Sequence, residues 1–151
     1  MENLIELELI KILEDACKIN VQTHKIKNIS DHLEDWDDIE DYPAIIVVCS
    51  DWFESGVEFQ GTLKDYTAYI FVLIYGETIE EARHIREVIS KRILECVRKN
   101  PSLNNLVDPE TRENVYGSRC VSGTFSEGGF EEGYTVIQRI ITTVQCEQIY
   151  T

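Results

Sequence analysis

The stretch Tyr66–Tyr75, which reads YTAYIFVLIY, constrains the fold more than any other part of this chain. Successive side chains of a strand point to opposite faces, and here both faces are apolar. One face carries Tyr66, Ala68, Ile70, Val72 and Ile74, and the other carries Thr67, Tyr69, Phe71, Leu73 and Tyr75. Such a strand has to be covered on both sides, by helices, by a second sheet or by a neighbouring subunit.

A long helix is predicted directly after this strand. Gly76 ends the strand, and Glu77 and Thr78 open a segment with acidic residues in its first turn, where the helix dipole favours them. Apolar residues then recur at three- and four-residue steps, at Ile79, Ala82, Ile85, Val88, Ile89, Ile93, Cys96 and Val97. Lys99 closes the helix, because Pro101 prevents its continuation. This helix covers one face of the strand, so function depends on what covers the other.

The segments before the central strand predict a helix and a neighbouring strand. Residues 3–19 carry an apolar stripe, and a short strand is possible at Val21–Ile26. Pro43 opens a strand over Ala44–Ser50. Ser55-Gly56 predicts a turn, after which the chain pairs back or leads into the central strand.

Two further strands are predicted after the long helix, at Arg119–Ser126 and Tyr134–Tyr150, with Gly128, Gly129 and Gly133 in their connection. The resulting order is α-β-β-α-β-β in a single domain, 1–151. The fold class is therefore α+β, with a mostly antiparallel sheet of about four or five strands packed with two main helices. Residues 100–118 form a long connection rich in turn residues, which is typical of a functional segment or one ordered by a partner.

The charge of the chain excludes several classes of function. The 14 basic and 28 acidic residues give a net charge of −14, which disfavours a duplex-binding surface because phosphate contacts need clustered Lys and Arg. No apolar run reaches about 18 residues, the length that predicts a membrane-spanning helix. The N-terminal segment has charges throughout and does not read as a signal peptide.

The five cysteines predict a reducing compartment. They are scattered, odd in number and without a CxxC pair, so we interpret them as reduced and mostly buried. Their positions are Cys17, Cys49, Cys96, Cys120 and Cys146. A structural zinc site is disfavoured, because zinc ligands occur in closely spaced pairs and the histidines are only His24, His32 and His84. His84 is predicted to be a surface residue of the long helix.

No cluster of residues points to catalysis or to a cofactor. The acidic stretch Asp31–Asp41 has no glycine, so a calcium loop is disfavoured against a solvated loop or short helix around Trp36. Asp108, Glu110 and Glu113 lie close in sequence, and metal-dependent hydrolysis would need a further carboxylate from a rigid strand. The candidates are Asp51 and Glu58, but no spacing selects them. We therefore predict a protein that is not an enzyme, with no catalytic, cofactor-binding or metal-binding residues.

The order of these segments resembles the tail terminator (tail completion) proteins of long-tailed bacteriophages. The resemblance covers residues 3–148 and rests most specifically on YPAIIVV at Tyr42–Val48 and on the strand and helix at Tyr66–Lys99. A late segment, IQRIITTVQ at Ile137–Gln145, belongs to the same pattern. None of these segments is an invariant motif, and the family has no catalytic residues to transfer.

This resemblance implies a virion protein of the tail or neck, assembled in the host cytoplasm. The family's members form a hexameric ring on the last ring of the tail tube, stop tube growth and present a surface to the head connector. The implied partners are the protein itself, the tail tube protein and a head–tail connector or neck protein. DNA would pass through the lumen without specific binding, and acidic walls would repel it. Acidity for solubility alone explains the charge equally well.

Other functions stay open at this level. They are another phage neck or head-completion protein, an unrelated assembly adaptor, and a small cytosolic enzyme or ligand-binding domain. In the tail terminator interpretation the connection at 100–118, together with residues 51–64, meets the partners. Deletion of residues 108–116 is then expected to spare folding and to abolish the joining of tails to heads.

Overall fold

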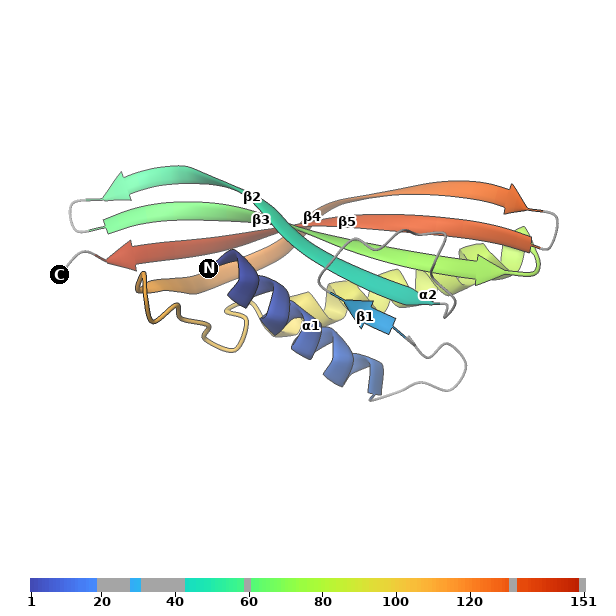
Figure 1. Ribbon diagram of the computed structural model, residues 1–151, viewed down its shortest axis with the longest axis horizontal. Helices are drawn as coiled ribbons and strands as arrows, with labels where there is room; N and C mark the ends of the chain where they lie inside the picture. Colours follow the sequence, from blue (N-terminus) through green and yellow to red (C-terminus); the bar gives the residue numbers. More distant parts are fainter. Residues whose placement is uncertain (19–27, 31–42, 59–60, 131–132, 150–151) are drawn as a thin grey trace.

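A long twisted antiparallel sheet with two helices forms the protein, as a computed structural model shows (Figure 1). The structure describes residues 1–18, 28–30, 43–58, 61–130 and 133–149. The elements are α1 (Glu2–Lys18), β1 (Asn28–Ser30), β2 (Ala44–Glu58), β3 (Gly61–Gly76), α2 (Ile79–Lys99), β4 (Glu113–Phe130) and β5 (Gly133–Ile149). The strand order is β1-β2-β3-β5-β4, and only the β1–β2 pair is parallel. The predicted α+β class and order of elements are confirmed.

The four main strands are much longer than the helices that cover them. They contain 15, 16, 18 and 17 residues. At roughly 3.3 Å per residue, such strands span about 50–60 Å. The helices contain 17 and 21 residues and, at about 1.5 Å per residue, span only about 25–32 Å. The β2–β3 hairpin accordingly extends beyond both helices at the left of Figure 1.

Both helices pack on the same face of the sheet, where they form the main core. The register places Val47 opposite Ile70, and Ile70 opposite Ile140, so these side chains share that face. Against them pack the buried residues of α1 and α2: Ile5, Leu9, Ile12, Leu13, Ala82, Ile85, Ile89 and Ile93. The predicted stripes of both helices therefore face the core.

The start of α2 follows the predicted signals closely. The Thr78 hydroxyl accepts a hydrogen bond from the backbone N–H of Glu81 at 3.2 Å, which satisfies one of the unpaired donors of the first turn. Arg98 and Lys99 occupy the last turn, and the backbone N–H of Asn100 donates to Val97 O at 3.2 Å. The boundaries predicted from Thr78 and Pro101 are confirmed.

Three predictions about strand boundaries are wrong. Ser55-Gly56 is not a turn, because β2 continues to Glu58 and a register shift between Glu54 and Gly56 takes up the extra residue. Gly128 and Gly129 lie inside β4, opposite Thr135 and Tyr134, and not in the connection. The strand β4 begins at Glu113 rather than at Arg119. In each case cross-strand pairing outweighs the local preference of glycine and serine for turns.

Two predictions fall on parts of the chain that the structure does not describe: the short strand at Val21–Ile26 and the acidic stretch Asp31–Asp41. In the described part, neither helix combines the length with the apolar composition that crossing a membrane requires.

Candidate assembly surface

The second face of the sheet has a central apolar patch, which the exposed Arg139 of β5 adjoins, and neither helix packs on it. We call this surface the helix-free face. In register, Ala44, Leu73 and Ile137 lie opposite one another on adjacent strands, as do Val48, Tyr69 and Ile141. With Ile46 and Phe71 from the row between them, these eight residues define the helix-free face. The helices contact the other side, as Figure 1 also shows.

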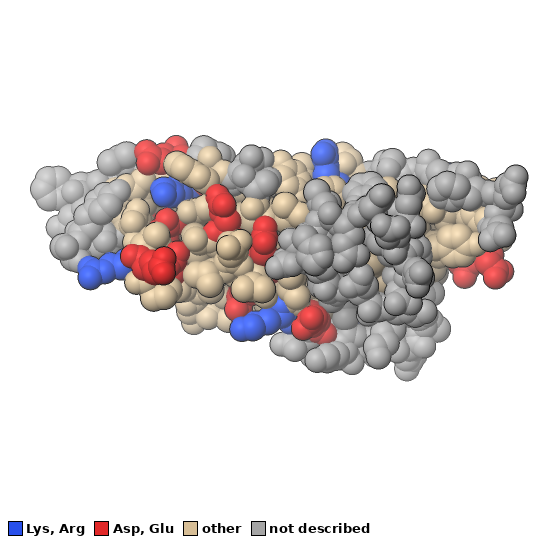
Figure 2. Space-filling model, in the orientation of Figure 1, with Lys and Arg blue, Asp and Glu red and all other residues tan. Residues whose placement is uncertain are grey.

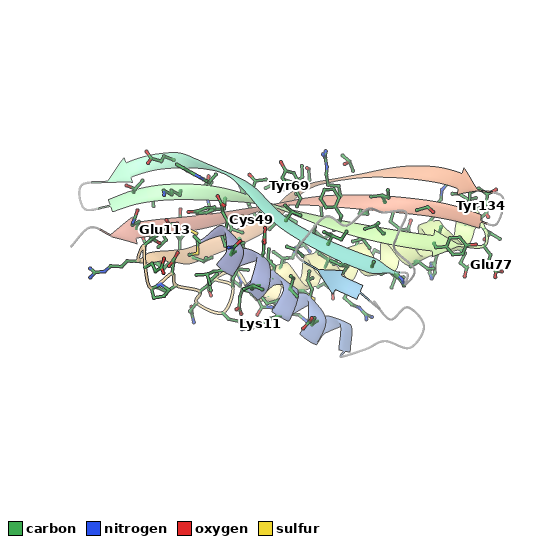
Figure 3. The ribbon with its side chains drawn as sticks, viewed as in Figure 1. Lys11, Cys49, Tyr69, Glu77, Glu113 and Tyr134 are labelled. Carbon is green, nitrogen blue, oxygen red and sulfur yellow. The ribbon has the colours of Figure 1, made fainter. Side chains whose placement is uncertain are left out.

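Burial on the helix-free face is incomplete. Ala44, Ile46 and Leu73 are buried, whereas Val48, Phe71 and Ile137 are only partly buried around them. The rings of Tyr69 and Phe71 stack with centroids 6.3 Å apart. Figure 3 shows Tyr69 on the side of the sheet away from the helices and Cys49 on the side of α1. Among the β3 residues that the sequence placed on the second face, only Leu73 is buried. Apolar area of this face is therefore left for a partner.

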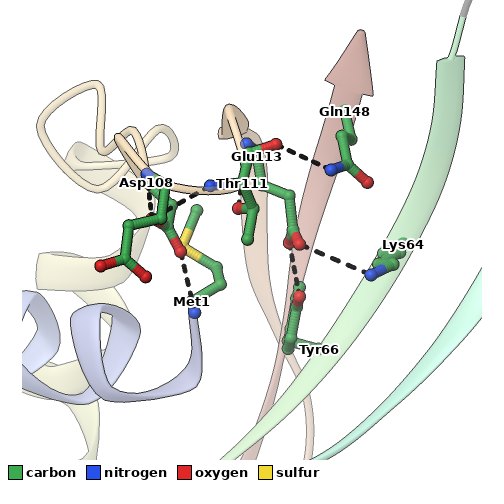
Figure 4. A network of polar contacts seen from close by, with 8 residues as sticks. Met1, Lys64, Tyr66, Asp108, Thr111, Glu113 and Gln148 are labelled. Carbon is green, nitrogen blue, oxygen red and sulfur yellow. Dashed lines mark hydrogen bonds and ion pairs between the residues drawn. The ribbon is translucent and has the colours of Figure 1, made fainter. Parts of the chain in front are cut away.

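A buried carboxylate connects β4 to the central strand. The side chain of Glu113 accepts a hydrogen bond from the Tyr66 hydroxyl and forms an ion pair with Lys64 Nζ at 3.5 Å (Figure 4). Burial raises the pKa of Tyr66, and the hydrogen bond to Glu113 raises it further. The Tyr66 hydroxyl therefore stays protonated and donates to Glu113. This hydrogen bond offsets the cost of burying the Glu113 carboxylate, which is 3% exposed.

A second carboxylate, Asp108, organises the connection between α2 and β4. It accepts hydrogen bonds from the backbone N–H of Glu110 at 2.9 Å and of Thr111 at 3.5 Å. The N-terminal ammonium of Met1 lies 3.1 Å away. The Glu110 N–H and the Met1 ammonium hold the pKa of Asp108 below its ordinary value. Figure 4 shows Asp108 directed toward the start of α1, and Glu113 toward β3.

These contacts change the interpretation of the carboxylates proposed for metal-dependent hydrolysis. Asp108 and Glu113 make separate contacts with donors of the chain itself, and Glu110 is exposed. The structure thus does not bring the three into one site, and the side chains of Asp51 and Glu58 lie outside the description. Within the described ranges, no three His, Cys, Asp or Glu side chains are grouped to hold a metal ion.

The connection at 100–118 is ordered by the chain itself. Asp108 N–H donates to Glu113 O at 2.8 Å, and Val115 N–H donates to Leu106 O at 3.0 Å. Leu103 is fully buried in the core. Residues 108–116 include buried Asp108, Glu113 and Val115. Their deletion is therefore now expected to destabilise the fold rather than to spare it. The segment is a structural part of the core.

The described cysteines, Cys49, Cys96, Cys120 and Cys146, are all free thiols, as predicted. Burial is the main cause that raises the pKa of Cys49 and of Cys146 to about 12. Such thiols carry almost no thiolate at neutral pH and are poor nucleophiles. His84 lies on the surface of α2, also as predicted. Sequence reasoning had no signal for the Tyr66–Glu113 contact, because its partners are 47 residues apart.

Comparisons with known proteins add little to this picture. No family model matches the sequence, and no curated protein matches it. The chain is similar to a chain in a solved structure described as "Virion of native gene transfer agent (GTA) particle". The TM-score is 0.49 and the identity 10%, over 92% of this chain and 94% of that chain. A likeness at this level carries no argument about function.

Proposed function

We propose that this protein is a phage virion component of the tail terminator type. It caps the tail tube as a ring, ends tube polymerisation and provides the docking surface for the head connector. Its role is structural and needs no catalytic residues or cofactor. Its partners are further copies of itself, the tail tube protein and the connector.

The helix-free face is the observation that carries this proposal. Helices of about 25–32 Å lie on one side of strands of about 50–60 Å. On the other side Tyr69, Phe71 and Ile137 leave apolar area partly exposed. Apolar area that a chain does not cover by itself is commonly covered by other subunits. A ring of copies supplies that cover, in agreement with the resemblance to tail terminators in YPAIIVV and YTAYIFVLIYG.

The charge of the chain supports a DNA-conducting ring. The sequence has 28 Asp and Glu against 14 Lys and Arg, and Figure 2 shows Asp and Glu side chains on the surface of the described chain. In our proposal the acidic residues face the lumen, where they repel phosphates and let DNA pass without specific binding. A lumen that proved neutral or basic would remove this part of the proposal.

Polymerisation of the tail tube tests the function directly. Purified protein is added to growing tubes of the cognate tail tube protein, and tube lengths are measured by electron microscopy. We expect elongation to stop, with a ring at one tube end. Unchanged lengths, together with no protein sedimenting with tubes, would overturn the proposal. Binding to tubes without arrest of growth would instead favour another neck component.

A variant of the helix-free face provides the matched control. Phe71→Ser removes an aromatic ring from that face, and we expect it to weaken ring formation and the arrest of tube growth. Leu7→Ser removes an exposed apolar side chain of α1, away from the helix-free face, and we expect it to behave like the wild type. Circular dichroism of both variants verifies that the fold is retained.

A further inference from the structure

The β2–β3 hairpin carries an exposed tryptophan beyond the ends of the helices. The Cys49 backbone N–H donates to the Glu6 carboxylate at 2.8 Å, so the first turns of α1 lie level with Cys49. The hairpin continues past this level and extends beyond both helices (Figure 1). We call this extension, residues 52–58 and 61–65, the hairpin arm. Trp52 lies on it and is 49% exposed.

The register places Trp52 on the helix side of the sheet. Trp52 lies opposite Tyr66, which lies opposite Val144, and both partners belong to the core under the helices. Glu54 is two residues further along β2, opposite Lys64, and therefore points to the same side. Glu54 is exposed as well. The arm thus presents an aromatic ring and a carboxylate together.

Neighbouring elements leave these two side chains accessible. The connection after α2 lies against the β5 side of this end of the sheet, where Gln148 Nε2 donates to Thr111 O at 2.7 Å. Trp52 and Glu54 stand on β2, at the other side of β3. Their exposure shows that the connection does not cover them.

The exposed ring of Trp52 is held by contacts that lead into the core. Lys64 Nζ lies 4.6 Å from the centroid of the ring, as a cation–π contact. The same Nζ forms the ion pair with buried Glu113, which also accepts from the Tyr66 hydroxyl. An aromatic side chain that is fixed before binding loses less entropy in an interface. Such anchors contribute most of the energy in many protein–protein contacts.

The helix-free face matches the arm in chemistry. Its apolar patch can receive the Trp52 ring, and exposed Arg139 lies at its centre, opposite Phe71. In a chain with a net charge of −14, a basic group beside an apolar patch favours a partner that brings an acidic group. Trp52 and Glu54 are about 7 Å apart along the strand, and Phe71 and Arg139 about 5 Å apart across strands. One placement of the arm therefore satisfies both.

The dimensions of the two surfaces also agree. The patch crosses three strands, about 10 Å between the outer axes, and extends about 13 Å from Ala44 to Val48. The arm is two strands wide and about 20 Å long. The helices do not obstruct the contact, because those of the receiving copy lie on its other face and those of the donating copy end before the arm.

We propose that the hairpin arm of one copy packs across the helix-free face of the next. Trp52 then contacts Tyr69 and Phe71, and Glu54 lies beside Arg139. Each copy gives its arm to one neighbour and its helix-free face to the other, which is the head-to-tail contact that generates rings. This inference rests on the proposed ring and names the two surfaces that build it.

Loss of the Trp52 ring tests the contact. Native mass spectrometry measures assembly of the wild type and of Trp52→Ser, alone and, after cross-linking, on isolated tail ends. We expect Trp52→Ser to weaken assembly at least about tenfold, because the interface loses its aromatic anchor. Tyr134→Ser is the matched control. Tyr134 is 39% exposed at the opposite end of the sheet, so its loss should leave assembly unchanged (Figure 3).

A charge exchange tests the placement of the arm. Glu54→Arg and Arg139→Glu each bring like charges together, whereas the double variant restores a facing pair. We expect each single variant to weaken assembly about fivefold and the double variant to recover most of that loss. Glu95→Arg makes the same change of charge at an exposed position of α2 and should have no effect.

The fluorescence of Trp52 follows the contact without removing it. The chain has two tryptophans, Trp36 and Trp52, so Trp36→Phe leaves Trp52 as the only one. We expect the emission of this variant to shift to shorter wavelength on assembly, because the ring leaves water. Addition of Phe71→Ser should reduce that shift.

The outcomes separate this inference from the proposed function. If the wild type forms rings and folded Trp52→Ser assembles equally well, or Trp52 emits alike in rings and single chains, the arm contact is overturned while the ring stands. A double charge variant no better than the single ones overturns the placement beside Arg139. If the wild type is a single chain both alone and on tails, both proposals are overturned. Circular dichroism and thermal melts verify the fold of every variant.

Discussion

The hydroxyl of Tyr66, in the central strand, donates a hydrogen bond to the carboxylate of Glu113, the first residue of β4. The same carboxylate forms an ion pair with Lys64 Nζ. Both contacts cross from β3 to the far edge of the sheet, past β5, and fix the end of the connection that follows α2. The stability of this end of the sheet therefore depends on a buried charge and its donors.

Removal of the Tyr66 hydroxyl is expected to destabilise the protein. In Tyr66→Phe, the buried carboxylate of Glu113 loses its best donor, at a cost of about 1–3 kcal/mol in the free energy of unfolding. Denaturation with urea measures this difference. Tyr134→Phe is the control, because Tyr134 is exposed and its hydroxyl should contribute little. Equal stability of the two variants would contradict a role of the Tyr66–Glu113 contact in the fold.

Acid is expected to remove the contribution of Asp108. Its pKa is lowered in the folded protein, first by the backbone N–H of Glu110 and also by the Met1 ammonium. A lowered pKa means that the stabilisation is complete above the unfolded pKa of about 4 and is lost as the pH falls through the folded pKa. The difference in unfolding free energy between the wild type and Asp108→Asn should thus be largest near neutral pH and shrink below pH of about 4. A difference that does not change with pH would show that the charge of Asp108 has no role.

The buried thiols are expected to resist alkylation. Because the pKa of Cys49 and of Cys146 is raised to about 12, both thiols stay protonated at pH of about 8. Iodoacetamide should therefore leave the peptides that contain them unmodified in the folded protein, as mass spectrometry can determine. The same peptides of the urea-unfolded protein are the control and should be fully modified. Equal rates in the folded and unfolded protein would show that these thiols are not buried.

The N-cap of α2 is expected to contribute measurably to stability. Thr78→Ala removes the hydroxyl that accepts from Glu81 N–H and should cost about 1 kcal/mol. Thr78→Ser keeps that hydroxyl and should retain most of the stability, which urea denaturation again measures. If Ala and Ser had the same effect, the loss would come from the methyl group and not from the cap.

Sequence periodicity predicted the central strand and α2 well, because a doubly apolar strand and a capped amphipathic helix are determined by local patterns. The pattern of Tyr66–Tyr75 correctly indicated a face that the helices do not cover. Local signals failed at Ser55-Gly56 and at Gly128-Gly129. There the long ladders with β3 and β5 hold turn-favouring residues in extended strands.

The candidate surface was only partly predictable. The β3 residues of the helix-free face could be read from the alternation in that strand, whereas the share of β2 and β5 in it follows from the strand order β1-β2-β3-β5-β4. Strand order is a tertiary property that local patterns do not determine. The connection at 100–118 was misinterpreted for the same reason, since the burial of Leu103 and Asp108 depends on contacts with distant segments.

A reconstruction of the protein on the ends of isolated tails tests the central claim most directly. The account predicts a closed ring of copies. In it, part of the helix-free face of each copy, around Tyr69 and Phe71, is covered by a neighbouring copy or by the tube. A single chain at the tail end, or a ring in which Tyr69 and Phe71 of every copy face water, would contradict it.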